Sequence, residues 1–234
     1  MYLHSLPLLL TTLLIALLIP SAIFTFTSSR NTVAMSSTTI TLAEAFKSRR
    51  SIRVITDDVK VVDSRIQEII HDAVLHTPSP FNAQEGRVVL LLKDEHKKYW
   101  DLAKEVVKGL VPAQFFERAY EPRIKMYRAG YGTALFFTDP APLKAFEAKW
   151  PTLVDEFPKC KSLIKVWTTL SAEGLGCSLQ HYDYPALDAR VSEEWNVPAT
   201  WKVKSQLVFG NPAETPPEKI FEPVENHRLF VHGA

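Results

Sequence analysis

The sequence predicts one folded domain of the α+β class behind a hydrophobic amino-terminal extension. The chain has 234 residues, 46% of them hydrophobic, which is enough to bury a substantial core. Segments with apolar residues at helical spacing are interleaved with short apolar runs typical of buried strands. They do not follow the strict rhythm of a doubly wound parallel sheet, and the eight glycines form no glycine-rich phosphate loop. A mixed α+β fold therefore fits the pattern best.

The amino-terminal extension differs in kind from the rest of the chain. Leu6–Phe26 contains no charged residue, so its length alone permits a membrane span or a signal-peptide core. Its uninterrupted apolar core, Leu8–Ile19, is short, and no Lys or Arg precedes it as a secretory signal requires. Met35 opens a natural start for a soluble domain. Residues 1–35 are therefore expected to be an anchor, a targeting segment or an alternative upstream start. Residues 36–234 should form a cytoplasmic domain, with membrane association only through residues 6–26.

The first part of the domain is expected to contain two helices and a strand. Thr41 can cap the first helix, and Glu44 stands at the third helical position, as a capping box requires. The second helix should span Val62–Leu75, where isoleucine and valine recur at helical spacing, and Pro78 stops it. The apolar run Arg87–Leu92 should then form a central strand.

The rest of the domain should be mostly helical, with two further strands. A helix beginning near Lys159 is the most apolar and should end at Gly174 and Gly176, while Pro122 should interrupt or kink an earlier helix. The other expected elements are helices over Glu95–Lys108, Pro112–Arg128, Pro140–Trp150 and Leu187–Trp195, strands over Tyr131–Phe137 and Val203–Phe209, and an extended proline-rich tail to Val231.

The composition and the residue spacings argue against several classes of function. The net charge of +1 gives no global attraction for nucleic acid, so an anion site needs a local positive cluster. Cys160 and Cys177 are too few for a disulfide framework and lack metal-ligand spacing, which fits a reducing compartment. No histidine pair has metal-ligand spacing, and no Ser, Cys or Thr has the surroundings of an activated nucleophile. We therefore predict no metal site and no catalytic side chain, and expect a cofactor to carry the chemistry.

Three arginines and a hydroxyl form the first candidate binding motif. Arg49, Arg50, Ser51 and Arg53 fall within five residues at the end of the first helix. Guanidinium groups make charge-assisted, often bidentate bonds to phosphate oxygens, and a cluster of this size suits a monoester phosphate. The alternative is a solvated basic helix end that complements the helix dipole.

Hydroxyl and amide side chains form the second motif, in the loop before the first strand. Ser79, Asn82 and Gln84 stand in P-S-P-F-N-A-Q. Each amide offers donors and an acceptor, so the pair can address a heterocycle whose edge alternates N–H and C=O, as the pyrimidine edge of a flavin does. The alternative is a turn in which Ser and Asn bond their own backbone.

Two further motifs lie late in the chain. Glu173 and Gly174 stand where the apolar helix ends, and a glycine there lets backbone approach a flat ligand closely, although an ordinary glycine cap explains the same pattern. In the tail, Lys219 and Arg228 are isolated positive charges that can close over an anion or be solvated.

The order of these motifs resembles that of the FMN-dependent nitroreductase family, from about residue 40 to residue 231. The strings EGLGCSLQHYDYP and WNVPATWKVKSQLVFGNP and the P-x-K-x-F tail are most similar to the fungal fatty-acid-responsive branch and its copper-induced bacterial relatives. Two positions depart from the wider family. Gly86 stands where a Trp often follows the Gln, and Phe221 replaces a tail Arg, whose charge Arg228 is the candidate to supply.

The resemblance implies a fold and an assembly. It implies a mainly antiparallel central sheet flanked by helices, in an intertwined homodimer with two FMN sites at the interface, each built by both chains. The arginine motif would contact the phosphate and ribityl chain, with Arg53 also near the pyrimidine, and the amide motif would come from the other subunit. The backbone of Glu173 and Gly174 would lie by the flavin N5, with Leu175 beside it, and Lys219 would bind the phosphate.

The resemblance also implies an activity. NADH or NADPH would deliver hydride to FMN, and a nitroaromatic or quinone acceptor would then take the same place and be reduced. The alternative is a flavin- or lipid-binding sensor in fatty-acid or oxidative-stress signalling with little turnover.

Overall fold

The computed structural model describes residues 40–151, 162–224 and 227–233. Its centre is a five-stranded sheet in which every strand pair is antiparallel. The order is β1-β5-β3-β2, and β4 also pairs with β5. The strands are β1 (Ile55–Thr56), β2 (Gly86–Leu92), β3 (Gly132–Thr138), β4 (Gly176–Gln180) and β5 (Lys202–Pro212). The mixed α+β class with a mainly antiparallel sheet is confirmed.

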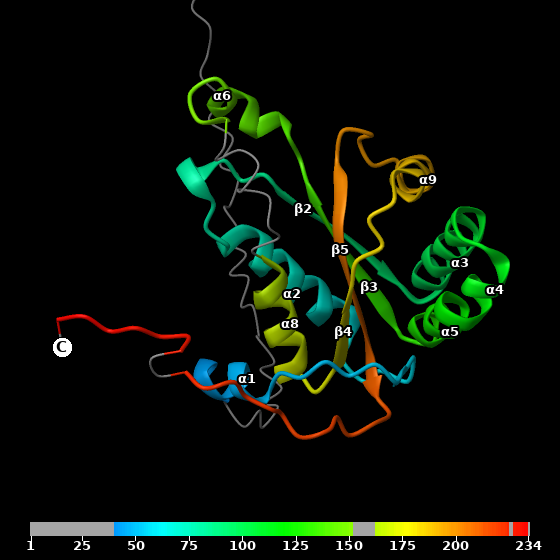
Figure 1. The fold of residues 1–234 in the computed structure, drawn as a ribbon, viewed down its shortest axis with the longest axis horizontal. Helices are drawn as coiled ribbons and strands as arrows, with labels where there is room; N and C mark the ends of the chain where they lie inside the picture. The colour runs from blue at the N-terminus through cyan, green and yellow to red at the C-terminus, as the bar shows by residue number, and fades with distance from the viewer. Residues whose placement is uncertain (1–39, 152–161, 225–226, 234) are drawn as a thin grey trace, which may run out of the picture. The chain divides into compact units, whose positions relative to one another are not determined.

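Helices cover both faces of this sheet, as Figure 1 shows. One face carries α2 (Asp63–His76) and α8 (Ser162–Ala172), and α1 (Leu42–Ser48) packs beside α8. The other face carries the remaining long helices, which are α3 (Lys93–Leu110), α5 (Glu121–Arg128) and α9 (Pro185–Trp195), together with the short segments α4 (Ala113–Phe115) and η2 (Phe116–Tyr120).

The central strand β3 explains why its sequence is an unbroken apolar run. All seven of its residues are buried, and the four from Ala134 to Phe137 alternate between two core clusters. Leu135 and Phe137 belong to the cluster under α3 and α5, whereas Ala134 and Phe136 belong to the cluster under α2 and α8. A strand covered on both faces has no solvent side and so shows no polar alternation.

The first two helices follow their sequence signals. The Glu44 amide donates to Thr41 Oγ1 (3.3 Å), and the Glu44 carboxylate accepts from the Thr41 amide (2.8 Å), so the capping box is present. α2 ends at His76, shortly before Pro78. Lys165 of α8 donates to the Asp72 carbonyl near the end of α2, and Arg65 near its start binds Glu173 just after α8, so the two helices run antiparallel.

Strands β1 and β4 were not expected from the sequence. β4 follows directly after Gly176 and contains Ser178 and Gln180, so its short, partly polar sequence reads as the loop after a helix. β1 has only two residues. Both are held by β5, whose 11 residues pair with three other strands, and this tertiary pairing leaves no local signal.

Two predicted helices are broken into shorter pieces. The segment expected over Pro112–Arg128 is divided into α4, the π-helical η2 and α5, because Pro122 stands at the start of α5. The segment expected over Pro140–Trp150 contains only η3 (Ala141–Leu143) and α6 (Lys144–Glu147).

Some predictions fall outside the described ranges. They concern residues 1–35, which include the apolar stretch 6–26, and the beginning of the predicted apolar helix, which includes Cys160. Among the helices that the structure describes, none has the length and apolar character needed to cross a membrane.

Candidate functional site

The arginine motif lies beside the turn that leads from α8 into β4. After α1 the chain becomes extended, and Ser51 forms a parallel bridge with Cys177 of β4. The Ile52 amide donates to the Cys177 carbonyl at 2.9 Å. Because Cys177 is only three residues after Gly174, this pairing brings two sequence-distant motifs together.

Arg49 is held in place by an aromatic ring. Its guanidinium carbon lies 4.3 Å from the centroid of Trp167 on α8, a cation–π arrangement. Its Nη1 is buried and has no hydrogen-bond partner. Burial lowers the pKa of Arg49, and the charge of Arg50 acts in the same direction. A buried donor without an acceptor is costly, so this atom is suited to a ligand oxygen.

The three guanidiniums of the cluster form no described salt bridge, although the Glu214 carboxylate binds the Arg53 amide. Within the described ranges, no Asp or Glu forms an ion pair with Arg49, Arg50 or Arg53, whereas Arg65 and Arg87, for example, each have an acidic partner. The three guanidiniums therefore form a local concentration of positive charge in a chain of almost neutral net charge. Such a site favours an anion.

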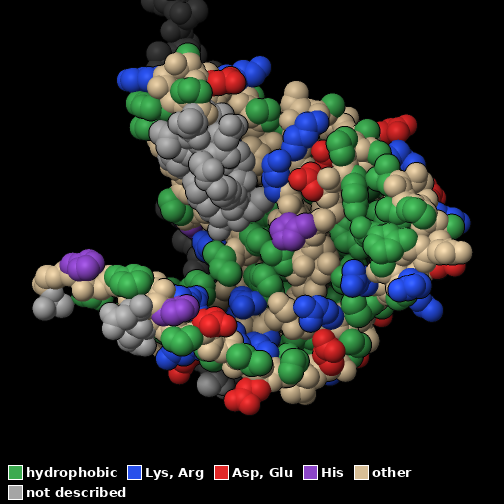
Figure 2. Space-filling model, viewed as in Figure 1, with side chains coloured by type: hydrophobic (Ala, Val, Ile, Leu, Met, Phe, Trp, Pro, Cys, Tyr) green, Lys and Arg blue, Asp and Glu red, His purple; other side chains and the backbone are tan. Residues whose placement is uncertain are grey.

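The tail is bound to this cluster. Arg50 Nη2 donates to the Pro217 carbonyl. The Glu214 carboxylate accepts from the amides of Arg53 (2.8 Å) and Val54 (3.2 Å), and these hydrogen bonds lower the pKa of Glu214. Lys219, half-buried, follows Pro217 by two residues. Figure 1 shows the tail passing along α1, and Figure 2 shows Lys and Arg side chains gathered along this part of the surface.

Arg228 is not joined to the cluster by a described contact. It is exposed on a later turn of the tail, where its amide donates to the Val224 carbonyl at 2.9 Å.

Gly174 provides open space next to the arginines. Its φ of +88° is a left-handed conformation that favours glycine, and a Cβ built there would meet no atom within 4 Å. The Glu173 side chain turns away to Arg65, with 2.7 Å between its Oε1 and Nη2, so mainly the backbone is presented here. The Leu175 side chain is buried in the core. A flat ligand could thus lie over the Glu173–Gly174 backbone.

The amide motif forms a tight loop, defined here as residues 79–84 and called the amide loop. Phe81, Asn82 and Gln84 all have positive φ, between 51° and 55°. The Gln84 amide donates to Ser79 Oγ (2.8 Å), and the Asn82 amide donates to the Ser79 carbonyl (3.1 Å). Ser79 therefore closes the loop through the backbone, as a hydroxyl turn does, while the side chains of Asn82 and Gln84 are exposed.

Within one chain, the amide loop lies far from the arginine motif. Arg65, near the start of α2, contacts Glu173, whereas Ser79 follows the end of this 14-residue helix. A helix of that length spans about 21 Å, so the two motifs lie at opposite ends of α2 (Figure 1). A single ligand of cofactor size would touch both motifs only where two copies of the chain meet.

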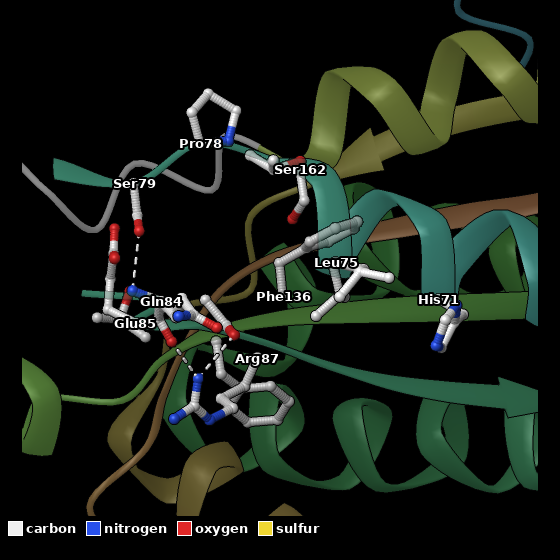
Figure 3. Close-up of a pocket in the computed structure, with 14 residues that line it drawn as sticks. His71, Leu75, Pro78, Ser79, Gln84, Glu85, Arg87, Phe136 and Ser162 are labelled. Carbon is white, nitrogen blue, oxygen red and sulfur yellow. Dashed lines mark hydrogen bonds between the residues drawn. The ribbon is translucent and has the colours of Figure 1, made fainter. Parts of the chain in front are cut away.

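A cavity of about 380 Å³ opens beside the amide loop, as Figure 3 shows. Leu75 and Phe136 give it an apolar wall, and Ser79, Gln84 and Arg87 line its polar side.

Arg87 was expected only as the first residue of a strand, but it fixes the base of the amide loop. It donates to the Gln84 carbonyl, and its Nη2 lies 2.8 Å from Asp139 Oδ2. Trp167 and Glu214 were likewise missed. A charged residue at the start of an apolar strand is a signal that could have indicated Arg87, but nothing local marks the other two.

Aromatic side chains lie on the other face, near α5. Tyr127 is buried, which raises its pKa, and the charges of Arg123 and Arg53 oppose this effect. The hydroxyls of Tyr120 and Tyr184 lie 3.4 Å apart, and this hydrogen bond, together with burial, raises the pKa of Tyr184 to about 12. The charge of Arg53, a member of the arginine cluster, therefore acts on a tyrosine of this aromatic group.

Comparison with known proteins gives the family. Residues 46–211 match the sequence model of the nitroreductase family. The chain is 35% identical over 163 residues to nitroreductase FRM2 of Saccharomyces cerevisiae, covering 67% of this chain and 79% of the yeast protein. It is 31% identical over 189 residues to HBN1 of the same yeast, covering 77% and 93%.

A solved structure agrees with the sequence comparisons. Nitroreductase CinD from Lactococcus lactis, in complex with chloramphenicol, superposes with a TM-score of 0.70 at 32% identity, covering 82% of this chain and all of CinD. A second CinD structure, in complex with 4-nitrophenol, gives a TM-score of 0.69. The chain therefore belongs to the nitroreductase family, in the branch of the two yeast proteins, and is an oxidoreductase with the family's fold.

Proposed function

We propose that this chain is an FMN-dependent NAD(P)H oxidoreductase that reduces nitroaromatic or quinone acceptors as a cytoplasmic homodimer. The observation that carries the proposal is the buried Nη1 of Arg49, which has no hydrogen-bond partner, within a cluster of arginines whose guanidiniums form no described salt bridge. The complex of CinD with 4-nitrophenol supports the acceptor class.

The residues present fit FMN at both of its ends. Arg49, Arg50 and Ser51 would hold the phosphate, and Lys219 would reach it from the tail segment that Arg50 binds. The open space over Gly174 would receive the flat ring system. When bound, FMN supplies the ring that accepts hydride from NAD(P)H and passes it to the acceptor.

The chain's own residues would supply position and electrostatics. Arg53, whose charge already acts on Tyr127, would stabilise negative charge near the pyrimidine end of the ring. The Glu173–Gly174 backbone would set the distance of closest approach. Glu214 would keep the tail, and hence Lys219, at the phosphate end.

A second copy would complete the site with its amide loop. Ser79, Asn82 and Gln84 would then address the pyrimidine edge from the partner. Exposed apolar side chains on α1, α2 and α8 support an interface on this face; they are Leu42, Phe46, Val74, Leu75 and Ile164. Large exposed apolar patches commonly mark protein interfaces.

Titration of the apo-protein with FMN tests the proposal. We expect saturable binding, a yellow protein, and loss of the colour when NADPH or NADH is added without oxygen. Oxidation of NAD(P)H should then depend on an added nitroaromatic or quinone. A chain that binds no FMN overturns the proposal, whereas FMN binding with no response to any such acceptor favours the sensor alternative.

A further inference from the structure

We infer that Phe81, Phe146 and Trp150, here called the aromatic clamp, act as positioning residues that hold the amide loop ready for the flavin. The inference rests on the proposed function, because it assigns the clamp to the same FMN site. Phe81 stands inside the motif P-S-P-F-N-A-Q, but the sequence analysis assigned no role to any of the three residues.

The clamp joins two segments far apart in the sequence. The Phe81 ring lies 5.0 Å from Phe146 and 4.8 Å from Trp150 between centroids, at interplanar angles of 17° and 12°. The Phe146 and Trp150 rings are 6.4 Å apart at 29°. Phe81 therefore lies across the other two rings in offset stacking, which is the favourable arrangement for aromatic pairs.

This stack is not ordinary core packing. Phe81 remains 56% exposed although it contacts two rings, and neither hydrophobic core cluster includes any of the three residues. The contacts fix the position of the ring without burying it. Their effect should therefore fall on the conformation of the segment that carries Phe81.

That conformation needs support. Phe81 has φ of 52° and Asn82 has φ of 55°, and bulky residues such as Phe rarely adopt the left-handed region. Backbone held in this way persists where its surroundings over-determine it, commonly at functional sites. The stack on Phe146 and Trp150 is a contact that can select this conformation of Phe81, and with it the direction of the neighbouring Asn82.

A second connection fixes the other end of the same loop. Asp139 accepts from Arg87 (2.8 Å) and, through Oδ1, from the Ala141 amide (3.0 Å), and Arg87 also donates to the Gln84 carbonyl. The segment after β3 is thus tied to the base of the loop by Asp139 and to its tip by the clamp. Asn82 and Gln84 lie between these two points.

The chemical consequence concerns the two amides. Their hydrogen bonds to a pyrimidine edge depend on direction, so a loop that samples other conformations would bind FMN more weakly. Those hydrogen bonds also act on the ring that becomes negatively charged on reduction, so their loss should shift the reduction potential of the bound flavin. A purely structural role for the clamp would not change that potential.

Trp150→Ala tests the clamp, with Trp150→Phe as the conservative variant. We expect Trp150→Ala to weaken FMN binding about tenfold, to shift the flavin reduction potential, and to speed hydrogen exchange of the apo-protein amides in residues 81–84. Trp150→Phe keeps a stacking ring and should stay within about twofold of wild type. Phe115→Ala is the matched control, because Phe115 is 54% exposed and stacks edge-on against Tyr120 on the other face of the sheet.

The outcomes separate this inference from the proposed function. If wild type binds FMN and Trp150→Ala has the same FMN affinity and the same flavin reduction potential, the positioning role of the clamp is overturned and the proposed function stands. If Trp150→Phe is as weak as Trp150→Ala, or if Phe115→Ala weakens binding equally, stacking at the loop is not the cause and the inference is again overturned. A wild-type chain that binds no FMN overturns both.

Discussion

Arg49 is positioned before any ligand arrives. The ring of Trp167 holds its guanidinium, and partial burial has already removed some of the water around it. An anion that binds there meets a preorganised donor, so little of the interaction is lost to ordering a long side chain.

The first prediction concerns this residue. Arg49→Ala should weaken FMN binding by about 1.5–3 kcal/mol, the usual size for a hydrogen bond to a charged group, and Arg49→Lys should recover only part of the loss. Fluorescence titration with FMN measures both. Lys47→Ala is the control, since Lys47 is an exposed cation in the last turn of the same helix. Equal affinity of Arg49→Ala and Lys47→Ala would mean that the cluster is only a solvated helix end.

Gly174 makes a second prediction at the same scale. Gly174→Ala should lose about 1–2 kcal/mol of unfolding free energy, because of its positive φ. It should lose more in FMN binding, since the added methyl group would occupy the open space that the ring needs. Denaturant unfolding and FMN titration give the two values.

Gly109→Ala is the matched control for Gly174. Gly109 lies in the last turns of α3, has no atom within 4 Å of a built Cβ and has no positive φ. Alanine there should raise stability by up to about 1 kcal/mol and leave FMN affinity unchanged. A Gly174→Ala protein that loses stability but binds FMN normally would show that the glycine serves only to end α8.

At the scale of elements, α3 is joined to β3 by a buried polar group. His96 Nδ1 lies 2.7 Å from Thr133 Oγ1, and Trp100 Nε1 donates to the same oxygen at 3.0 Å. Burial lowers the pKa of His96 to about 4, and the charges of Lys97 and Arg128 act in the same direction. The histidine is therefore neutral in the folded chain at ordinary pH.

The third prediction follows from this pKa. An unfolded chain takes up a proton at His96 near pH 6.5, whereas the folded chain does so only near pH 4. Protonation of His96 therefore favours the unfolded chain below pH 6.5. The free energy of unfolding should fall as the pH is lowered from 6.5 to 4, by up to about 3 kcal/mol from this residue. Urea unfolding at pH 7.5 and pH 5 measures the loss, and His96→Gln should have a smaller difference between the two. An equal pH dependence in the variant would contradict it.

The elements that the sequence predicted well are those with a local cause. The Thr41–Glu44 capping box fixes the start of α1, and burial on both faces makes β3 apolar throughout. β4 could not be predicted, because Ser178 and Gln180 are accommodated by pairing with β5 rather than by their own preferences. The clamp was missed for a similar reason, since Phe81 meets Phe146 and Trp150 only through the tertiary fold.

At the scale of the whole molecule, the residue patterns indicated the arginine and amide motifs but not their separation, which only the family resemblance implied. Arg49 reaches Trp167 of α8, and Ser79 lies beyond the other end of α2, a distance that no local pattern contains. The same separation explains why each motif looks ordinary by itself, since half of a binding site need resemble no more than a basic helix end or a turn.

The fourth prediction uses this separation. Suppose that each FMN site takes its arginines from one chain and its amides from the other. Two variants that each bind FMN weakly should then complement each other, one carrying Arg49→Ala and the other carrying both Asn82→Ala and Gln84→Ala. In a heterodimer one site carries both defects and the other carries neither. An equal mixture in which half of the dimers are heterodimers should thus regain about a quarter of its sites at wild-type affinity.

Subunit exchange followed by FMN titration measures the recovered sites. Mixing two preparations of the same variant is the control and should recover none. If the Arg49→Ala and Asn82→Ala/Gln84→Ala mixture also recovers none, although mass spectrometry shows heterodimers, the two motifs do not share a ligand across the interface. Recovery of a tight fraction near a quarter requires that they do, because a site built within one chain would carry one of the two defects in every dimer.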